Sequence, residues 1–166
     1  MKTRNMVLCA LFAALMAICA WISVPTGSVS FTLQTFALFL TLLVLGGKWG
    51  SVTVLVYLTL GAVGIPVFSG FQGGIGTLLG PSGGFFLGFM LTNLLYWLVI
   101  SLFGNRFLTN LIALCTGLLL CYLCGWLWYS RFATVNFFFW CLPYLLPDAV
   151  KMILAFFLAK RLKSVI

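Results

Sequence analysis

The stretch between Lys48 and Arg106 contains no charged residue. One crossing of the hydrocarbon core needs about 20 apolar residues, so this stretch is long enough for two membrane helices and a connection. The rest of the chain has the same character, because 64% of its 166 residues are hydrophobic and only 6% are charged. This composition is outside the range of soluble domains. We therefore predict an all-α integral membrane protein, since helices satisfy their own backbone hydrogen bonds in lipid.

Turn residues divide the chain into six apolar segments, with breaks at Pro25–Ser28, at Gly46–Lys48 and at Gly104–Arg106. The first apolar run is long for a cleaved signal peptide and is predicted to be retained. An aromatic segment, 136–146, is predicted to lie on the outer surface, with the last helix starting near Pro147. The predicted transmembrane helices, in one membrane domain covering 1–166, are 6–22, 31–46, 49–64, 84–103, 108–129 and 147–163.

The formal net charge of +8 comes from nine cations and a single acid, Asp148. Such an excess can indicate nucleic-acid binding, but most of these cations stand where apolar segments end, as in the cytoplasmic loops of membrane proteins. We predict a multi-pass protein of the cell membrane that binds no nucleic acid. With both termini in the cytoplasm, Arg131 is outside, Lys151 is within the membrane, and seven cations are inside: Lys2, Arg4, Lys48, Arg106, Lys160, Arg161 and Lys163.

Asp148 and Lys151 are the charges that need an explanation. Each costs roughly 2.5 to 3.5 kcal/mol on insertion scales. Their spacing of three residues places both on one face of a helix. Two interpretations follow: a structural ion pair that anchors the helix end, or a ligand site with one strong acceptor and one strong donor.

The glycine-rich stretch Phe68–Gly84 has no charge and is predicted to form a lid or cavity lining, the alternative being a loosely ordered connector. It lacks the lysine of a phosphate-binding loop. The sequence also has no histidine, so it cannot form a Ser-His-Asp triad or a histidine-based metal site, and one carboxylate cannot form a two-carboxylate hydrolase site. The six cysteines are predicted to be small apolar residues. We therefore expect neither an enzyme nor a bound metal or cofactor.

Four alanines on the first predicted helix are spaced so that another helix can approach closely. They form the pairs Ala10 with Ala14 and Ala13 with Ala17. The pattern fits either a docking surface for a partner or packing within the bundle.

Three runs, FTLQTFALFLTLLVLGGKWG (31–50), GAVGIPVFSG (61–70) and GGIGTLLGPSGGFFLGF (73–89), together with the late Asp-x-x-Lys, resemble the BioY family. That family comprises the biotin-binding S components of energy-coupling factor transporters. The resemblance implies a six-helix substrate-binding subunit with a site near the outer surface. It also implies partners: a transmembrane T component, which docks on an A-x-x-x-A motif of the first helix (here Ala10, Ala13, Ala14 and Ala17), and two cytoplasmic ATP-binding cassette ATPases.

The resemblance also suggests which residues hold biotin, whose ureido ring has two N–H donors and a carbonyl acceptor. Asp148 is expected to accept from the ureido N–H groups, whereas Lys151 is expected to serve either the ureido carbonyl or the biotin carboxylate. The remaining expected contacts are Gln72, Thr32, Gln34, Phe71, Phe85 and Gly74. There are two alternatives to a biotin-binding subunit. One is an S component for another vitamin such as thiamine or riboflavin, and the other is a structural membrane subunit.

Overall fold

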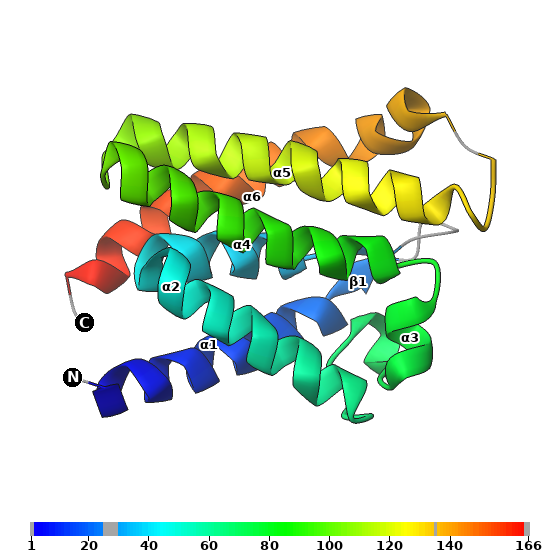
Figure 1. Cartoon of the computed structure of the whole chain (residues 1–166), viewed down its shortest axis with the longest axis horizontal. Helices are drawn as coiled ribbons and strands as arrows, with labels where there is room; N and C mark the ends of the chain where they lie inside the picture. The colour runs from blue at the N-terminus through cyan, green and yellow to red at the C-terminus, as the bar shows by residue number, and fades with distance from the viewer. Residues whose placement is uncertain (1, 25–29, 135, 165–166) are drawn as a thin grey trace.

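The computed structural model describes residues 2–24, 30–134 and 136–164, and these are mostly helical (Figure 1). In chain order the elements are α1 (Lys2–Trp21), β1 (Ser23–Val24), β2 (Phe31–Thr32), α2 (Gln34–Ala62), η1 (Ser69–Phe71), α3 (Ile75–Leu79), α4 (Gly83–Phe103), α5 (Phe107–Tyr129) and α6 (Phe137–Lys163).

Among the described residues, four helices are long and apolar enough to cross a membrane, namely α1 from Thr3 onward, α2, α4 and α5. The predicted break at Pro25–Ser28 lies outside the described residues, but β1 and β2 on either side of it pair in antiparallel fashion. They hold the end of α1 against the start of α2.

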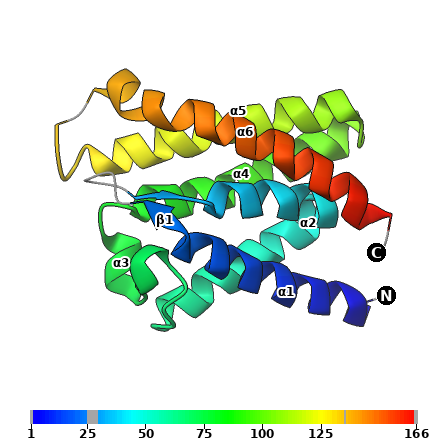
Figure 2. The same ribbon diagram turned by 180° about the vertical axis from the view of Figure 1, so that it is seen from behind.

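The predicted helices 31–46 and 49–64 correspond to two arms of α2. The arms meet at Gly46, whose φ of 74° is in the left-handed region that favours glycine. The chain reverses direction there, and the second arm runs back alongside α1 and α4 (Figures 1 and 2). The first arm is the centre of the molecule, because its apolar side chains are almost completely buried on every side: Ala37, Leu38, Phe39, Leu40 and Leu42. The count of six crossings stays a prediction.

The last helix begins earlier than the sequence indicated. Residues 136–146 were predicted to be an interfacial segment, but α6 is helical from Phe137 and continues through Pro143 and Pro147. Each proline removes one backbone hydrogen bond of the helix. Membrane helices tolerate this loss where neighbouring groups satisfy the freed carbonyls, so proline at 147 did not mark the start of the helix.

The two ends of the bundle differ. Both termini, the break within α2 and the connection between α4 and α5 lie at one end, whereas the β1–β2 ribbon and α3 lie at the other (Figures 1 and 2). Helix α4 packs closely against α5 and α2, and α1 and α6 both pack against α2. The second arm of α2 can approach α4 closely because a Cβ on Gly47 would lie 2.3 Å from the Cβ of Trp97 and 2.4 Å from its Cα.

We therefore expect Gly47→Ala to lower the stability of the protein in detergent by roughly 1–3 kcal/mol, the usual cost of overpacking. The backbone of α4 would have to move, since rotation of the Trp97 side chain cannot relieve a clash with Cα. Gly76→Ala in α3 is the matched control, because a Cβ there meets nothing within 4 Å. Thermal unfolding measures both variants, and equal melting temperatures would contradict the close contact between α2 and α4.

Candidate functional site

The site is built around the two charged side chains of α6 that are one helical turn apart. Lys151 Nζ lies 2.6 Å from Asp148 Oδ1, and the residues are only 5% and 3% exposed. An ion pair with this burial is expensive unless every charge is also hydrogen-bonded. The surrounding elements supply those bonds.

Lys151 has three N–H donors, and each has an acceptor. Besides the Asp148 carboxylate, the ammonium donates to the carbonyl oxygen of Thr32 at 2.7 Å and to Thr35 Oγ1 at 3.0 Å. The same nitrogen lies 3.7 Å from the centre of the Phe31 ring, which is a cation–π contact. The cation of α6 is therefore anchored to β2 and to the first turn of α2.

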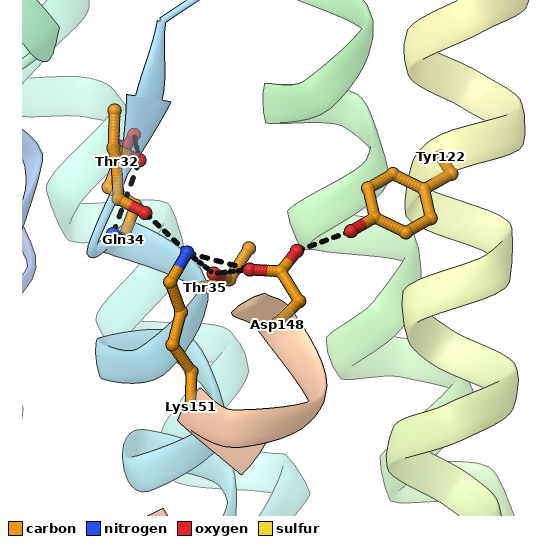
Figure 3. A network of polar contacts seen from close by, with 6 residues as sticks. All are labelled: Thr32, Gln34, Thr35, Tyr122, Asp148 and Lys151. Atoms are coloured by element: carbon orange, nitrogen blue, oxygen red, sulfur yellow. Dashed lines mark hydrogen bonds and ion pairs between the residues drawn. The ribbon is translucent and has the colours of Figure 1, made fainter. Parts of the chain in front are cut away.

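Asp148 binds groups from two sides (Figure 3). Its Oδ1 accepts from Lys151 and, at 2.8 Å, from the Thr35 hydroxyl, while its Oδ2 accepts from the Tyr122 hydroxyl of α5. A carboxylate has about four acceptor positions, so these three bonds leave Oδ2 able to accept one more. The network joins α2, α5 and α6 at one point and still presents an acceptor.

A second chain of hydrogen bonds connects β2 to the segment before η1. The Thr32 hydroxyl donates to Gln34 Oε1 at 3.2 Å, and Gln34 Nε2 donates to the Tyr57 hydroxyl. Tyr57 in turn donates to the carbonyl oxygen of Val67 at 3.0 Å. Both Gln34 and Tyr57 are buried, so this chain fixes the glycine-rich stretch relative to the ion pair.

A cavity of about 360 Å³ lies beside the ion pair, within the range of small-molecule sites. Its lining includes residues of β2, of the first turn of α2 and of the glycine-rich stretch, and Figure 1 shows β1 and α3, the neighbours of these segments, at the end of the bundle away from the termini. The wall is mainly aromatic and hydroxyl-bearing, and its lining residues are Ser30, Phe31, Thr32, Gln34, Thr35, Phe68, Ser69, Gly70, Gln72, Thr77, Pro81, Ser82, Phe85, Phe86, Phe89, Cys121, Tyr122, Tyr144, Asp148 and Lys151.

Most of the candidate residues expected from the sequence line this one cavity: Asp148, Lys151, Gln72, Thr32, Gln34 and Phe85. Two others do not line it. Phe71 is 64% exposed and stacks on Trp21 of α1 with ring centres 5.0 Å apart. Gly74 precedes α3 and donates its N–H to the Gly61 carbonyl at 2.6 Å.

The glycine-rich stretch has defined structure. Phe68 donates its N–H to the carbonyl of Gln72 at 2.9 Å, and the turn between them contains η1. Ser69, Thr77 and Ser82 of this stretch line the cavity. It forms a wall of the cavity, in agreement with the predicted cavity lining and not with a loosely ordered connector.

Sequence reasoning missed several residues that contact the ion pair or line the cavity. Thr35 is the last residue of the FTLQT element, and its place in that motif was the available signal. Tyr122 had no such signal, because nothing in its sequence surroundings separates it from the other aromatic residues of α5. Phe86 and Phe89, one helical turn apart on α4 and buried, also line the cavity.

The four alanines of α1 separate into two faces. Ala13 and Ala17 are 3% and 6% exposed and belong to the core. Ala10 and Ala14 are exposed. Of the two pairs, only Ala10 and Ala14 are on a surface that another protein can reach.

The fold and the site together define a multi-pass membrane protein with a partly polar cavity of small-molecule size near one end of its helical bundle. The model of the BioY family matches residues 1–166. A probable biotin transporter BioY of Pyrococcus horikoshii is 44% identical to this chain, over 99% of each sequence. The biotin transporter BioY2 of Lactococcus lactis subsp. cremoris is 34% identical, over 92% of this chain and 86% of that protein. The chain belongs to the BioY family.

A solved structure agrees with this family. The crystal structure of the S-component for biotin from an ECF-type ABC transporter superposes with a TM-score of 0.88. The match covers 98% of this chain and 92% of the other, at 25% sequence identity.

The site geometry gives a test of how the ion pair contributes to stability. Asp148→Leu leaves the Lys151 ammonium buried without its carboxylate, which should destabilise the protein by roughly 3–5 kcal/mol. The double variant Asp148→Leu/Lys151→Met removes both charges and should recover most of that loss. Thermal unfolding in detergent compares the variants, and a double variant as unstable as the single one would show that the charges do not act as a pair.

Proposed function

We propose that this chain binds biotin in the 360 Å³ cavity and is the substrate-capture subunit of an ATP-driven vitamin uptake transporter. The observation that carries the proposal is the buried Asp148–Lys151 pair facing a cavity with an aromatic wall. The names of the relatives and of the solved structure support the same substrate.

The chemistry of biotin matches the inner part of the cavity. A ureido N–H would donate to the acceptor position left on Asp148 Oδ2, next to the Tyr122 hydroxyl. The thiophane ring and valeryl chain would then pack against Phe85, Phe86 and Phe89. A charge-assisted hydrogen bond to a buried carboxylate is both strong and directional, so the ureido ring is the group most suited to this position.

The outer part of the cavity suits the carboxylate of biotin. Gln72 is exposed and supplies an amide donor, and Ser69 and Ser82 supply hydroxyl donors. Lys151 already donates to three acceptors of the chain, so a contact with either the ureido carbonyl or the carboxylate would replace one of these bonds. In this proposal the chain binds its substrate without metal or cofactor and performs no catalysis.

The orientation follows from the distribution of charge. The end of the bundle with both termini carries seven cations at helix ends and connections, and the positive-inside rule assigns such an end to the cytoplasm. The cavity would then open toward the outside of the cell membrane, where the vitamin arrives. These seven cations are Lys2, Arg4, Lys48, Arg106, Lys160, Arg161 and Lys163.

Energy would come from partners, namely a transmembrane T component and two cytoplasmic ATP-binding cassette ATPases. The exposed pair Ala10 and Ala14 offers a face of α1 on which a helix of the T component can pack closely. Ala13 and Ala17, which the sequence also suggested for docking, are covered by the protein itself.

Replacing the acceptor tests the substrate. Asp148→Asn should weaken biotin binding by about tenfold or more, which corresponds to about 1.4 kcal/mol, because an ionised acceptor becomes a neutral amide. Labelled-biotin binding to the detergent-solubilised protein measures this, with Lys48→Gln as the control at the opposite end. An unchanged affinity would remove Asp148 from the site, and displacement of label by thiamine or riboflavin rather than unlabelled biotin would contradict the proposed substrate.

The docking face has its own test. Ala10→Leu and Ala14→Leu should abolish co-purification with the T component and leave the affinity for biotin unchanged, because both side chains are exposed and neither lines the cavity. The same substitution at Ala13 or Ala17 should instead lower the melting temperature, since there is no room for the larger side chain in the core. Full co-purification of the Ala10 and Ala14 variants would exclude this face.

A further inference from the structure

A second hollow lies at the other end of the bundle, between α2, α5 and α6. Its volume is about 640 Å³. The walls are formed by apolar side chains from all three helices, including Leu43, Leu111, Met152 and Phe156. It shares no lining residue with the cavity beside Asp148, so it is a separate feature of the molecule.

The hollow is an open groove because α5 and α6 contact each other little, in contrast to the close packing of α4 on α5. Figure 2 shows the C-terminal part of α6 in red, crossing beside the start of α5 in green. Large apolar side chains on its rim are left uncovered: Phe107 is 67%, Ile153 57% and Phe157 71% exposed. In a membrane protein such a groove is open to acyl chains.

The groove has cationic residues at one end only. Lys160 and Lys163 are one turn apart on α6 and both line it, so both ammonium groups are on the same face. The single acidic side chain of the sequence, Asp148, is bound to Lys151 near the middle of α6 and does not line the groove. The amide of Asn110, which also lines the groove, donates to Asn105 Oδ1 and to the Arg106 carbonyl and accepts from Tyr96. The lysines are thus the groups that offer charge to a ligand.

The length of the groove matches one leaflet of a membrane. From Met152 to Lys163, α6 rises about 16 Å at 1.5 Å per residue, and the hydrocarbon core is about 30 Å thick. A lipid with its phosphate at the two lysines would extend its acyl chains along the groove to about the middle of the bilayer.

We propose that this groove binds one anionic phospholipid from the leaflet at the terminal end, with the phosphate held by Lys160 and Lys163 and an acyl chain packed between α5 and α6. Basic pockets between membrane helices commonly bind such head groups. No residue of α1 lines the groove, so it is distinct from the exposed face formed by Ala10 and Ala14. The lipid would fill the poorly packed space between α5 and α6 and hold the two helices together.

The test measures phospholipid retained by the full chain after detergent exchange, by native mass spectrometry, with added phosphatidylglycerol or phosphatidylcholine. The unsubstituted protein should retain one phosphatidylglycerol, and the bound lipid should raise its melting temperature. Retention of phosphatidylcholine should be at least about fivefold lower. Lys160→Gln/Lys163→Gln should lose this preference. The control Lys48→Gln/Arg161→Gln removes the same charge from exposed residues that do not line the groove and should keep it.

The acyl chain is tested separately. Ile153→Trp fills the groove and should reduce phosphatidylglycerol retention, whereas Leu154→Trp, at a residue of similar exposure outside the groove, should not. Biotin binding should be unchanged in all four variants, which shows that each one is folded. Three results would overturn the proposal. They are equal retention of the two lipids, equal loss of retention in the two tryptophan variants, and an equal rise in melting temperature with soluble glycerophosphoglycerol, which has no acyl chains. Loss of T-component co-purification in Ile153→Trp with unchanged lipid retention would assign the groove to a protein helix and also overturn it.

Discussion

The buried contact between Asp148 and Lys151 is the interaction on which the rest of the structure depends. Two charges inside an apolar bundle are tolerated only when each is paired and hydrogen-bonded. Thr32 and Thr35 from β2 and α2, and Tyr122 from α5, provide those bonds. The position of α6 is thereby fixed against helices that come much earlier in the chain. The cavity exists at this point because a polar network, not close apolar packing, connects the helices.

The structural and the ligand-binding interpretations of this pair are compatible. The network satisfies all three donors of Lys151 but only three of about four acceptor positions of Asp148. It is therefore stable without a guest and still able to accept a hydrogen bond from one. The polar, enclosed end of the bundle and its cationic, lipid-accessible end share no lining residues, so they can be altered separately.

The positions where sequence-based expectation and structure differ have local causes. Proline at 147 suggested a helix start, but α6 runs through it from Phe137, because a membrane helix can lose one backbone bond without ending. Phe71 belongs to the glycine-rich stretch that covers the cavity, yet it stacks on Trp21 of α1. The alanine pattern predicted a close helix contact but not which face makes it. Spacing along a helix determines which residues share a face, and only the neighbouring helices decide which face is covered.

By itself, the sequence determined the membrane character, most of the breaks between helices, the concentration of cations near one end, and the two charges that had to share a face. These properties depend on composition and on the helical repeat, which are local. The tertiary structure decided that Thr35, Tyr122 and the aromatic wall of α4 surround the charges, that Ala10 and Ala14 are exposed while Ala13 and Ala17 are not, and that α5 and α6 separate into a groove. Residues far apart in the chain meet there, and no local rule encodes which of them will be neighbours.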